Sequence, residues 1–162
     1  MITQSELKEC LHYDPDTGIF VRLKSGTNRV RVGSVAGCLD NCGYIPIELA
    51  GKQYYAHRLA FLFMTGSFPP KYTDHINGVK NDNRWLNLRQ ATRSQNQHNQ
   101  GKNSKNTSGF KGICWHKNAK KWHAQITHMN RKIHIGYFTT PEAAHQAYIE
   151  AAEKLHGDFA NY

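Results

Sequence analysis

Apolar residues in the first part of the chain recur at helical spacing and then in short alternating segments. Thr3 and Glu6 have the spacing of a capping box, and Leu7, Cys10 and Leu11 follow on one face of the predicted opening helix. The turn residues and the alternation that come next predict strands and one further helix. We expect strands at 18–23, 30–35, 43–49 and 53–56, the last two as a hairpin turned at Gly51 and Lys52, and a helix at 57–64.

The second half of the chain has a different and more regular pattern. Three strand-like segments at 110–115, 122–127 and 132–137 are joined by short polar turns, which predicts a three-stranded antiparallel meander. Thr140 and Pro141 are typical of the first residues of a helix, and Gly157 is typical of its end. An apolar stripe at helical spacing lies between them, formed by Ala143, Ala144, Ala147, Tyr148, Ala151 and Leu155. The sequence therefore predicts a small sheet packed on one helix.

Asparagine, aspartate, arginine and glutamine dominate residues 74–99, between these two regions. Asp74 and His75 are adjacent, so on an extended backbone their side chains point to opposite faces. A second short strand is expected at 88–92, and a helix that begins near Thr92 carries Asn96. We expect that helix to pack against the two strands and to bring Asn96 beside Asp74.

The side chains of this segment have complementary chemistry. A carboxylate oxygen of Asp74 and an amide oxygen of Asn96 suit a hard cation such as Mg²⁺ or Mn²⁺, with water and phosphate oxygens as further ligands. His75 has an ordinary pKa near neutrality and is the candidate general base for the attacking water. Asn87 is expected to bond the backbone of the intervening loop and to fix the two strands.

The spaced set Asp74, His75, Asn87 and Asn96 resembles the HNH family of endonucleases, with its beta-beta-alpha metal fold. The resemblance implies that Asp74 and Asn96 bind the metal, that His75 activates water and that Asn87 is structural. Many relatives have histidine where this chain has Asn96, which favours Mg²⁺ or Mn²⁺ over softer metals.

The segment 55–60 resembles the His-Arg-Leu stretch before the metal motif of phage HNH proteins and extends the resemblance to residues 54–99. A phage source would place the protein in the cytoplasm of a bacterial host. His57 and Arg58 are candidates for phosphate contact or for structural bonding. Arg89 and Arg93 are further candidates for DNA contact.

Charge points to a polyanionic partner. The formal net charge is +9, from 21 lysines and arginines against 12 acids, and nucleic acid is the leading partner for a soluble protein of this kind. The longest apolar stretch, 59–64, is too short to span a bilayer, so no membrane partner is expected. The four cysteines are scattered, which fits a reducing cytosol, and whether Cys38 and Cys42 bind zinc stays open.

Residues 107–161 resemble the plant ethylene-response-factor, or Apetala-type, DNA-binding domain. The resemblance rests on segments such as Gly109-Phe110-Lys111-Gly112-Ile113 and Ile135-Gly136-Tyr137-Phe138. It implies a three-stranded sheet that lies in the major groove, with a helix behind it. Residues 101–140 contain lysine and arginine but no acid, which agrees with a DNA contact. The DNA-contact candidates are Lys111, Trp115, Lys117, Lys121, Gln125, Arg131, Lys132 and His134, whereas Trp122 is expected in the core and Trp115 is open to the same interpretation.

We therefore expect an α+β chain with an HNH nuclease domain at 1–100, its metal motif at 72–99, a linker at 101–106 and an Apetala-type domain at 107–162. The expected activity is metal-dependent hydrolysis of double-stranded DNA by a monomer or weak dimer, with one nick per active site. Two alternatives stay open. One is a non-cleaving DNA-binding or regulatory protein on a nuclease scaffold, and the other is a protein that binds or cleaves RNA.

Overall fold

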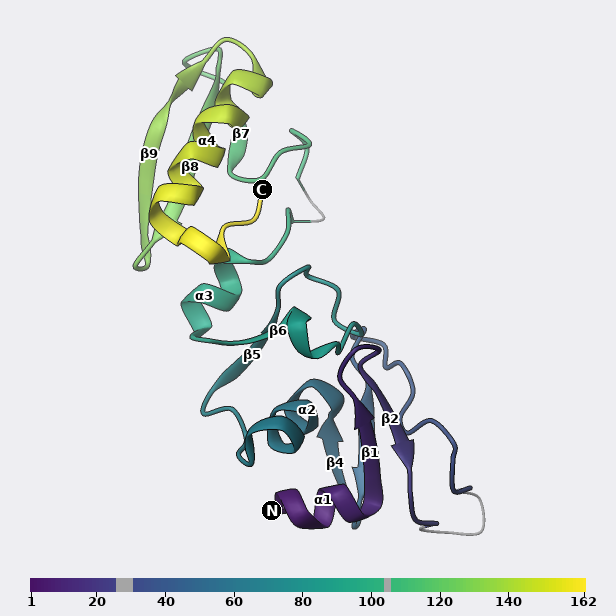
Figure 1. Ribbon diagram of the computed structural model, residues 1–162. Coiled ribbons are helices and arrows are strands. Elements are labelled where there is room, and N and C mark those ends of the chain that lie inside the picture. Colours follow the sequence, from purple (N-terminus) through teal and green to yellow (C-terminus); the bar gives the residue numbers. More distant parts are fainter. Residues whose placement is uncertain (26–30, 104–105) are drawn as a thin grey trace. The chain divides into compact units, whose positions relative to one another are not determined.

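The computed structural model describes residues 1–25, 31–103 and 106–162. The chain divides into two compact units, Met1–Ala91 and Thr92–Tyr162, each with its own hydrophobic core (Figure 1). Both units mix helices with antiparallel strands, which confirms the α+β class. None of the helices in the described part of the chain combines the length and the apolar character needed to cross a membrane.

The N-terminal unit begins with helix α1 (Gln4–Cys10) and the hairpin β1 (Leu11–Asp14) and β2 (Ile19–Arg22). The predicted capping box of Thr3 and Glu6 is confirmed. The expectation that Leu11 continues the helix is wrong, because Leu11 is extended and pairs with Arg22, and its side chain is fully buried there.

The strand expected at 30–35 does not form over its described residues. Val30 lies outside the described residues, and Val35 makes only an isolated bridge with Val21. Gly33 has a φ of +82°, and Ser34 N–H donates to the Arg31 carbonyl at 3.2 Å. This tight turn interrupts the extended run that the alternation predicted.

The predicted hairpin and helix are both present after this segment. Strands β3 (Pro46–Leu49) and β4 (Lys52–Tyr55) pair antiparallel. Their turn is made by Ala50 and Gly51, both with positive φ, and not by Gly51 and Lys52 as expected, because Lys52 pairs with Leu49. Helix α2 (Ala56–Thr65) follows at once and ends at Gly66, which is in the left-handed conformation. The core between these elements includes Leu7, Leu11, Tyr13, Phe20, Ile47, Leu59, Ala60 and Phe61.

A third hairpin completes the N-terminal unit. Strand β5 (Tyr72–His75) pairs with β6 (Leu88–Ala91), and the turn of 3-10 helix η1 (Trp85–Asn87) leads into β6. The register sets Asp74 opposite Arg89 and His75 opposite Leu88. Adjacent residues of β5 therefore present their side chains to opposite sides of the hairpin, as expected.

The C-terminal unit contains the predicted meander and its helix. Strands β7 (Ile113–His116), β8 (Lys121–His128) and β9 (Arg131–Phe138) form an antiparallel sheet in that order. Helix α4 (Pro141–His156), capped by Thr140, packs on one face of the sheet and is followed by the 3-10 turn η2 (Gly157–Phe159). Their shared core contains Ile113, Ala124, Ile126, Ala144, Tyr148 and Ala152.

Helix α3 (Arg93–His98) also belongs to the C-terminal unit. It begins where the sequence predicted, with Thr92 as its N-cap. Polar contacts hold its C-terminal end. Lys111 Nζ donates to the His98 carbonyl at 2.6 Å, and Asn161 Nδ2 donates to the Asn99 carbonyl at 2.9 Å. The expected linker at 101–106 has no helix or strand at 101–103 and 106, and its residues 104–105 lie outside the described part.

Close packing between sheet and helix leads to a prediction at Gly112. This residue has a φ of +72°, and an added Cβ would collide with the ring of Tyr148 and lie 2.6 Å from the Gln125 carbonyl oxygen. We expect Gly112→Ala to lower the free energy of unfolding of the C-terminal unit by about 2 to 4 kcal/mol, through overpacking and backbone strain. Urea unfolding followed by tryptophan fluorescence measures the change.

Gly109→Ala is the matched control, because Gly109 has a φ of +81° but nothing within 4 Å of an added Cβ. Gly109→Ala should lower the free energy of unfolding by about 1 kcal/mol, through backbone strain alone. Equal losses for the two variants would show that the contact with Tyr148 does not limit this position.

Candidate active site

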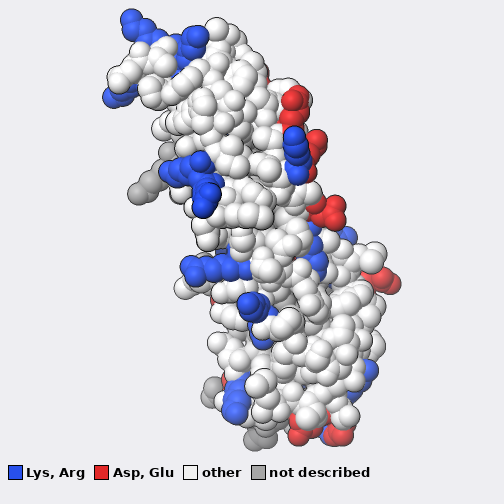
Figure 2. Space-filling view, turned by 90° about the vertical axis from the view of Figure 1, so that its left-hand side faces the viewer, with Lys and Arg blue, Asp and Glu red and all other residues white. Residues whose placement is uncertain are grey.

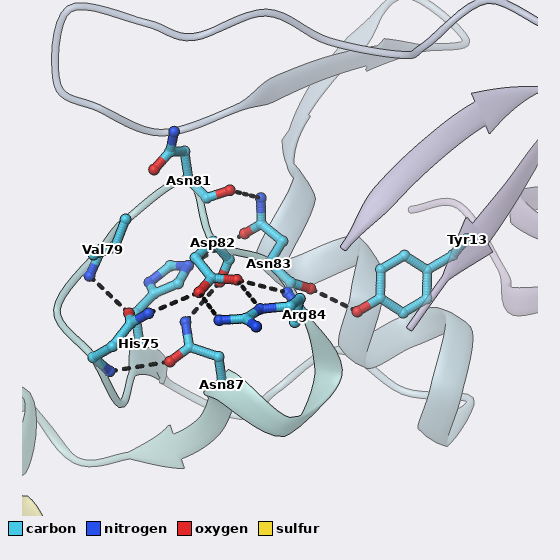
Figure 3. Close-up of polar contacts among 9 residues, drawn as sticks. Tyr13, His75, Val79, Asn81, Asp82, Asn83, Arg84 and Asn87 are labelled. Atoms are coloured by element: carbon cyan, nitrogen blue, oxygen red, sulfur yellow. Dashed lines mark hydrogen bonds and ion pairs between the residues drawn. The ribbon is translucent and has the colours of Figure 1, made fainter. Parts of the chain in front are cut away.

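The loop between β5 and β6 is held in place by Asn87 (Figure 3). Asn87 Oδ1 accepts a hydrogen bond from the Asn77 backbone N–H at 3.0 Å, and Asn87 Nδ2 donates to the Asp82 carbonyl at 2.7 Å. The buried amide thus links both ends of the loop. These are backbone contacts of the kind expected for Asn87 from the sequence.

Asp82 shapes the same loop from its outer side. Its carboxylate accepts from Arg84 Nε and Nη2 at 2.8 and 2.6 Å and from Asn77 Nδ2 at 2.7 Å. The hydrogen bonds from Arg84 are the main reason that the pKa of Asp82 is lowered to about 2. Asp82 is therefore an ionised carboxylate with three side-chain donors around it, which suits a structural role in the loop.

His75 is oriented by Asn83. His75 Nε2 lies 3.2 Å from Asn83 Oδ1, and Asn83 Nδ2 donates to the Asn81 carbonyl at 3.3 Å, which fixes which end of the amide faces the imidazole. Because the amide oxygen can only accept, Nε2 carries the hydrogen and the lone pair of neutral His75 is on Nδ1. This is the tautomer in which Nδ1 can take a proton.

Asn83 is itself held by a residue far away in the sequence. The hydroxyl of Tyr13, on β1, donates to the Asn83 carbonyl at 2.6 Å, and both side chains are almost fully buried (Figure 3). An alanine at Gly18, which has a φ of +75°, would collide with the Asn83 backbone. The β1–β2 hairpin therefore fixes the position of the residue that orients His75.

Burial keeps two imidazoles neutral beside each other. His75 is 5% exposed, and burial is the main cause that lowers its pKa. The ring of His57, on α2, stands nearly perpendicular to it with 5.3 Å between centroids, and burial lowers the pKa of His57 to about 3. Tyr44 packs against both rings. His57 was a candidate for phosphate contact, and its place in this buried cluster favours the structural alternative.

Asp74 forms a buried ion pair with its partner across the hairpin. Its Oδ2 lies 2.8 Å from both Nε and Nη2 of Arg89, and Asp74 is 3% exposed. Arg89 was a candidate for DNA contact, and the structure places its guanidinium on Asp74 instead. Asp74 lies in the N-terminal unit, whereas Asn96 lies on α3 in the C-terminal unit and is partly exposed, so their shared metal site stays a prediction.

The donor set predicted for a metal is small and consists of oxygen. Over the described residues, no group of three or more histidine, cysteine, aspartate and glutamate side chains is arranged to hold a metal ion. The carboxylate of Asp74 and an amide oxygen fit a hard cation that keeps most of its water or phosphate ligands. Cys38 and Cys42 are exposed free thiols.

The two other cationic candidates, Arg58 and Arg93, differ in their surroundings. Arg58 Nη1 donates to the Lys71 carbonyl at 3.3 Å, and its guanidinium lies 5.6 Å from the centroid of the Phe68 ring. Arg93, at the start of α3, is exposed. Arg93 is therefore the more exposed of the two.

The face of the sheet opposite α4 collects several of the predicted DNA-contact residues. Cross-strand pairing sets Gln125 beside His134 and Thr127 beside Lys132, and Lys121 beside His116. These residues alternate with the buried Ala124 and Ile126, so they lie on the open face. On the C-terminal unit, Figure 2 shows lysine and arginine gathered mainly on one flank and acids on another.

The remaining candidates lie elsewhere. Lys117 and Arg131 are exposed at the ends of the strands. Trp115 pairs with Trp122, their ring centroids are 5.3 Å apart, and Trp122 packs against the core, so Trp115 is on the face toward α4. The ammonium of Lys111 is bonded to the carbonyls of His98 and Asn161, and burial lowers its pKa to about 8. Neither Trp115 nor Lys111 lies on the open face.

Sequence reasoning assigned no role to Asn83 or Tyr13, which the structure connects to His75. Asn83 is within the spaced polar set, but nothing in that spacing separates it from the other asparagines. Tyr13 is 70 residues away from Asn83 in the chain. On the sheet, the structure adds Tyr137 to the open face, where it pairs with His123.

The buried His57 makes the stability of the N-terminal unit depend on pH. Its pKa is about 3 in the folded chain against an ordinary 6.5, so the unfolded chain binds the proton more readily. The stabilisation from neutral His57 is complete above about pH 6.5 and is lost as the pH falls toward 3, by up to about 1.4 kcal/mol per pH unit. Urea unfolding at pH 7 and pH 5 measures the slope.

His57→Phe should remove this share of the slope, since phenylalanine fills the site and does not titrate. His12→Gln is the control, because His12 is exposed on β1 and the same slope as wild type is expected. An unchanged slope in His57→Phe would contradict the assignment.

Comparison with known proteins agrees with these two groups of residues. The profile of the HNH endonuclease family matches residues 54–98, and the profile of the AP2 domain matches residues 108–158. Protein 3.8 of Escherichia phage T7 is 31% identical over 116 residues, which are 68% of this chain and 95% of the phage protein. No solved structure matches the chain. The chain therefore belongs to the HNH endonuclease family and carries an AP2 DNA-binding domain after its HNH segment.

Proposed function

We propose that the protein is a DNA endonuclease that hydrolyses phosphodiester bonds of double-stranded DNA, with His75 as the general base. The observation that supports this most directly is the buried, neutral His75, whose Nε2–H is directed to Asn83 and whose lone pair is on Nδ1. A base of this kind is ready to accept a proton at neutral pH. The HNH and AP2 matches support a nuclease or DNA-binding role in general.

In this proposal His75 Nδ1 takes the proton of the water that attacks the phosphorus. The positive charge that develops on the ring strengthens the hydrogen bond from Nε2 to Asn83 Oδ1, which is 3.2 Å long in the resting site. Because burial otherwise disfavours the charged imidazole, this bond offsets part of the cost. Asn83 is therefore a positioning residue, and His75 is the catalytic residue.

We further propose that Asp74 and Asn96 hold Mg²⁺ or Mn²⁺. When bound, such an ion neutralises the charge that develops on the phosphate and on the leaving oxygen. Arg89 orients the Asp74 carboxylate through a hydrogen bond of 2.8 Å from Nε to Oδ2 and through the ion-pair contact of Nη2 at the same distance. With one active site per chain, a monomer or weak dimer cuts one strand at a time.

The alternative of a non-cleaving DNA-binding protein has one observation in its favour. The carboxylate that should face a metal is already paired with Arg89, and both groups are largely buried. In that alternative the pair is a permanent structural element and the HNH hairpin is a scaffold only. The two proposals differ in whether a divalent cation changes the behaviour of the protein on DNA.

Relaxation of supercoiled plasmid DNA distinguishes them. We expect wild type to nick the plasmid with Mg²⁺ or Mn²⁺ but not with EDTA, and His75→Ala to lose at least about a thousandfold in rate while it keeps its DNA affinity. Gln97→Ala, at an exposed position of α3, is the control and should nick like wild type. Tight DNA binding without cleavage, over a panel of phage and bacterial DNA, would favour the regulatory alternative. Cleavage of RNA but not of DNA would show that the substrate is RNA.

Asn83 gives a second and separate prediction. Asn83→Ala removes the acceptor opposite His75 Nε2, so the nicking rate should fall by about tenfold to a hundredfold with DNA affinity unchanged. Asn83→Asp keeps an acceptor and should retain more activity than alanine. If both variants nick like wild type although they are folded, Asn83 does not position the base.

A further inference from the structure

A cluster of imidazole and phenol rings lies on the open face of the C-terminal sheet. It consists of His116 on β7, His123 on β8, and His134 and Tyr137 on β9. The ring centroids of His116, His123 and His134 lie 5.1, 5.2 and 4.9 Å from that of Tyr137. We call these four residues the histidine cluster.

A bulge in β9 brings the cluster together. His123 pairs with Tyr137 and Gln125 pairs with His134, so β9 has one extra residue, Ile135, at the point where the register shifts. Residues three apart in a regular strand face opposite sides, but this bulge sets His134 and Tyr137 on the same side. Cross-strand pairing places Cys114 next to His123 on this face.

Two of the imidazoles are in direct contact. His123 Nε2 lies 2.8 Å from His134 Nδ1, which requires a hydrogen on one nitrogen and a lone pair on the other. The pair can hold one added proton and keep this bond, but two added protons would bring like charges together. Burial, His134 and His116 lower the pKa of His123, in that order.

The segment that carries the cluster supplies no carboxylate for such a proton. The groups that face the cluster from β7 and β8 are the Cys114 thiol, whose Sγ is 3.8 Å from His123 Nδ1, and the lysine at 121. Lys132 follows on β9, and residues 101–140 contain no aspartate or glutamate. No carboxylate of residues 101–140 therefore compensates a positive charge on the cluster, and an anionic partner can do so.

We propose that the histidine cluster is a phosphate-binding site of the DNA interface, and that the His123–His134 pair takes up one proton when DNA binds. The inference rests on the proposed DNA binding of this sheet and adds the residues and the charge state. A phosphate oxygen accepts hydrogen bonds from imidazolium N–H groups and provides the missing counter-charge. The proton comes from solvent, so acidification favours the complex.

The test is the affinity of the full-length protein for a DNA duplex of about 20 base pairs, measured by fluorescence anisotropy at constant salt. EDTA is present throughout, so that neither cleavage nor metal binding by Cys114 and the histidines interferes. Wild-type affinity should rise about threefold to sixfold from pH 8 to pH 6, because tenfold is the limit when DNA raises the pKa of one group by about one unit.

Three variants test whether the His123–His134 pair takes up the proton when DNA binds. His123→Asn and His134→Asn should bind with little pH dependence, because an amide does not titrate. His134→Lys carries a fixed charge at an exposed position and should bind at pH 8 about as tightly as wild type binds at pH 6. His12→Asn, on β1 of the other unit, is the control and should behave like wild type. Circular dichroism establishes that each variant is folded.

The outcomes separate this inference from the proposed function. If wild type binds DNA but His123→Asn and His134→Asn keep the full pH dependence, the proton is taken up elsewhere and the inference is wrong. The same holds if wild-type binding does not depend on pH. If neither wild type nor His134→Lys binds DNA at any pH, the DNA-binding function itself fails.

Discussion

The hydrogen bond between Asn83 and His75 connects the chemistry of the site to the fold of the N-terminal unit. Asn83 is held by two hydrogen bonds. Its side-chain Nδ2 donates to the Asn81 carbonyl, and its backbone carbonyl accepts from the Tyr13 hydroxyl. An amide that cannot turn over imposes one tautomer on the imidazole it contacts. The lone pair of His75 therefore lies on Nδ1. Its position depends on the β1–β2 hairpin, which holds Asn83, and on the β5–β6 hairpin with its connecting loop.

Burial has two different consequences in this unit. For His75 and His57 it favours the neutral ring, and in the case of His75 this is the form that a general base needs. For Asp74 the low exposure is accompanied by a close guanidinium partner, Arg89, because an isolated carboxylate would be costly at such a position. The β5–β6 hairpin therefore combines a neutral, buried imidazole with a buried carboxylate that is paired with a guanidinium.

The sheet of the C-terminal unit packs against α4 with one face and presents polar side chains on the other. Ala124 and Ile126 pack against α4, where Gly112 allows the ring of Tyr148 to approach the backbone closely. The opposite face has lysine, glutamine and histidine at the alternate positions and no acid from its own segment. A sheet with one packed and one polar face can contact DNA without exposing its core.

The sequence by itself determined most of the helices and strands, the antiparallel meander with its helix and the two families, because hydrophobic periodicity, caps and spaced motifs are local properties. It did not predict strand β1, and the strand expected at 30–35 does not form over its described residues. It also indicated Asp74, His75, Asn87 and Asn96 as the chemical set. It could not show the extended conformation of Leu11, the contact of Tyr13 with Asn83, or the pairing of Arg89 with Asp74, because these depend on strand pairing and on distant segments. The bulge at Ile135, which sets His134 and Tyr137 on one face, was likewise decided by the tertiary structure, since register is a property of paired strands and not of one strand alone.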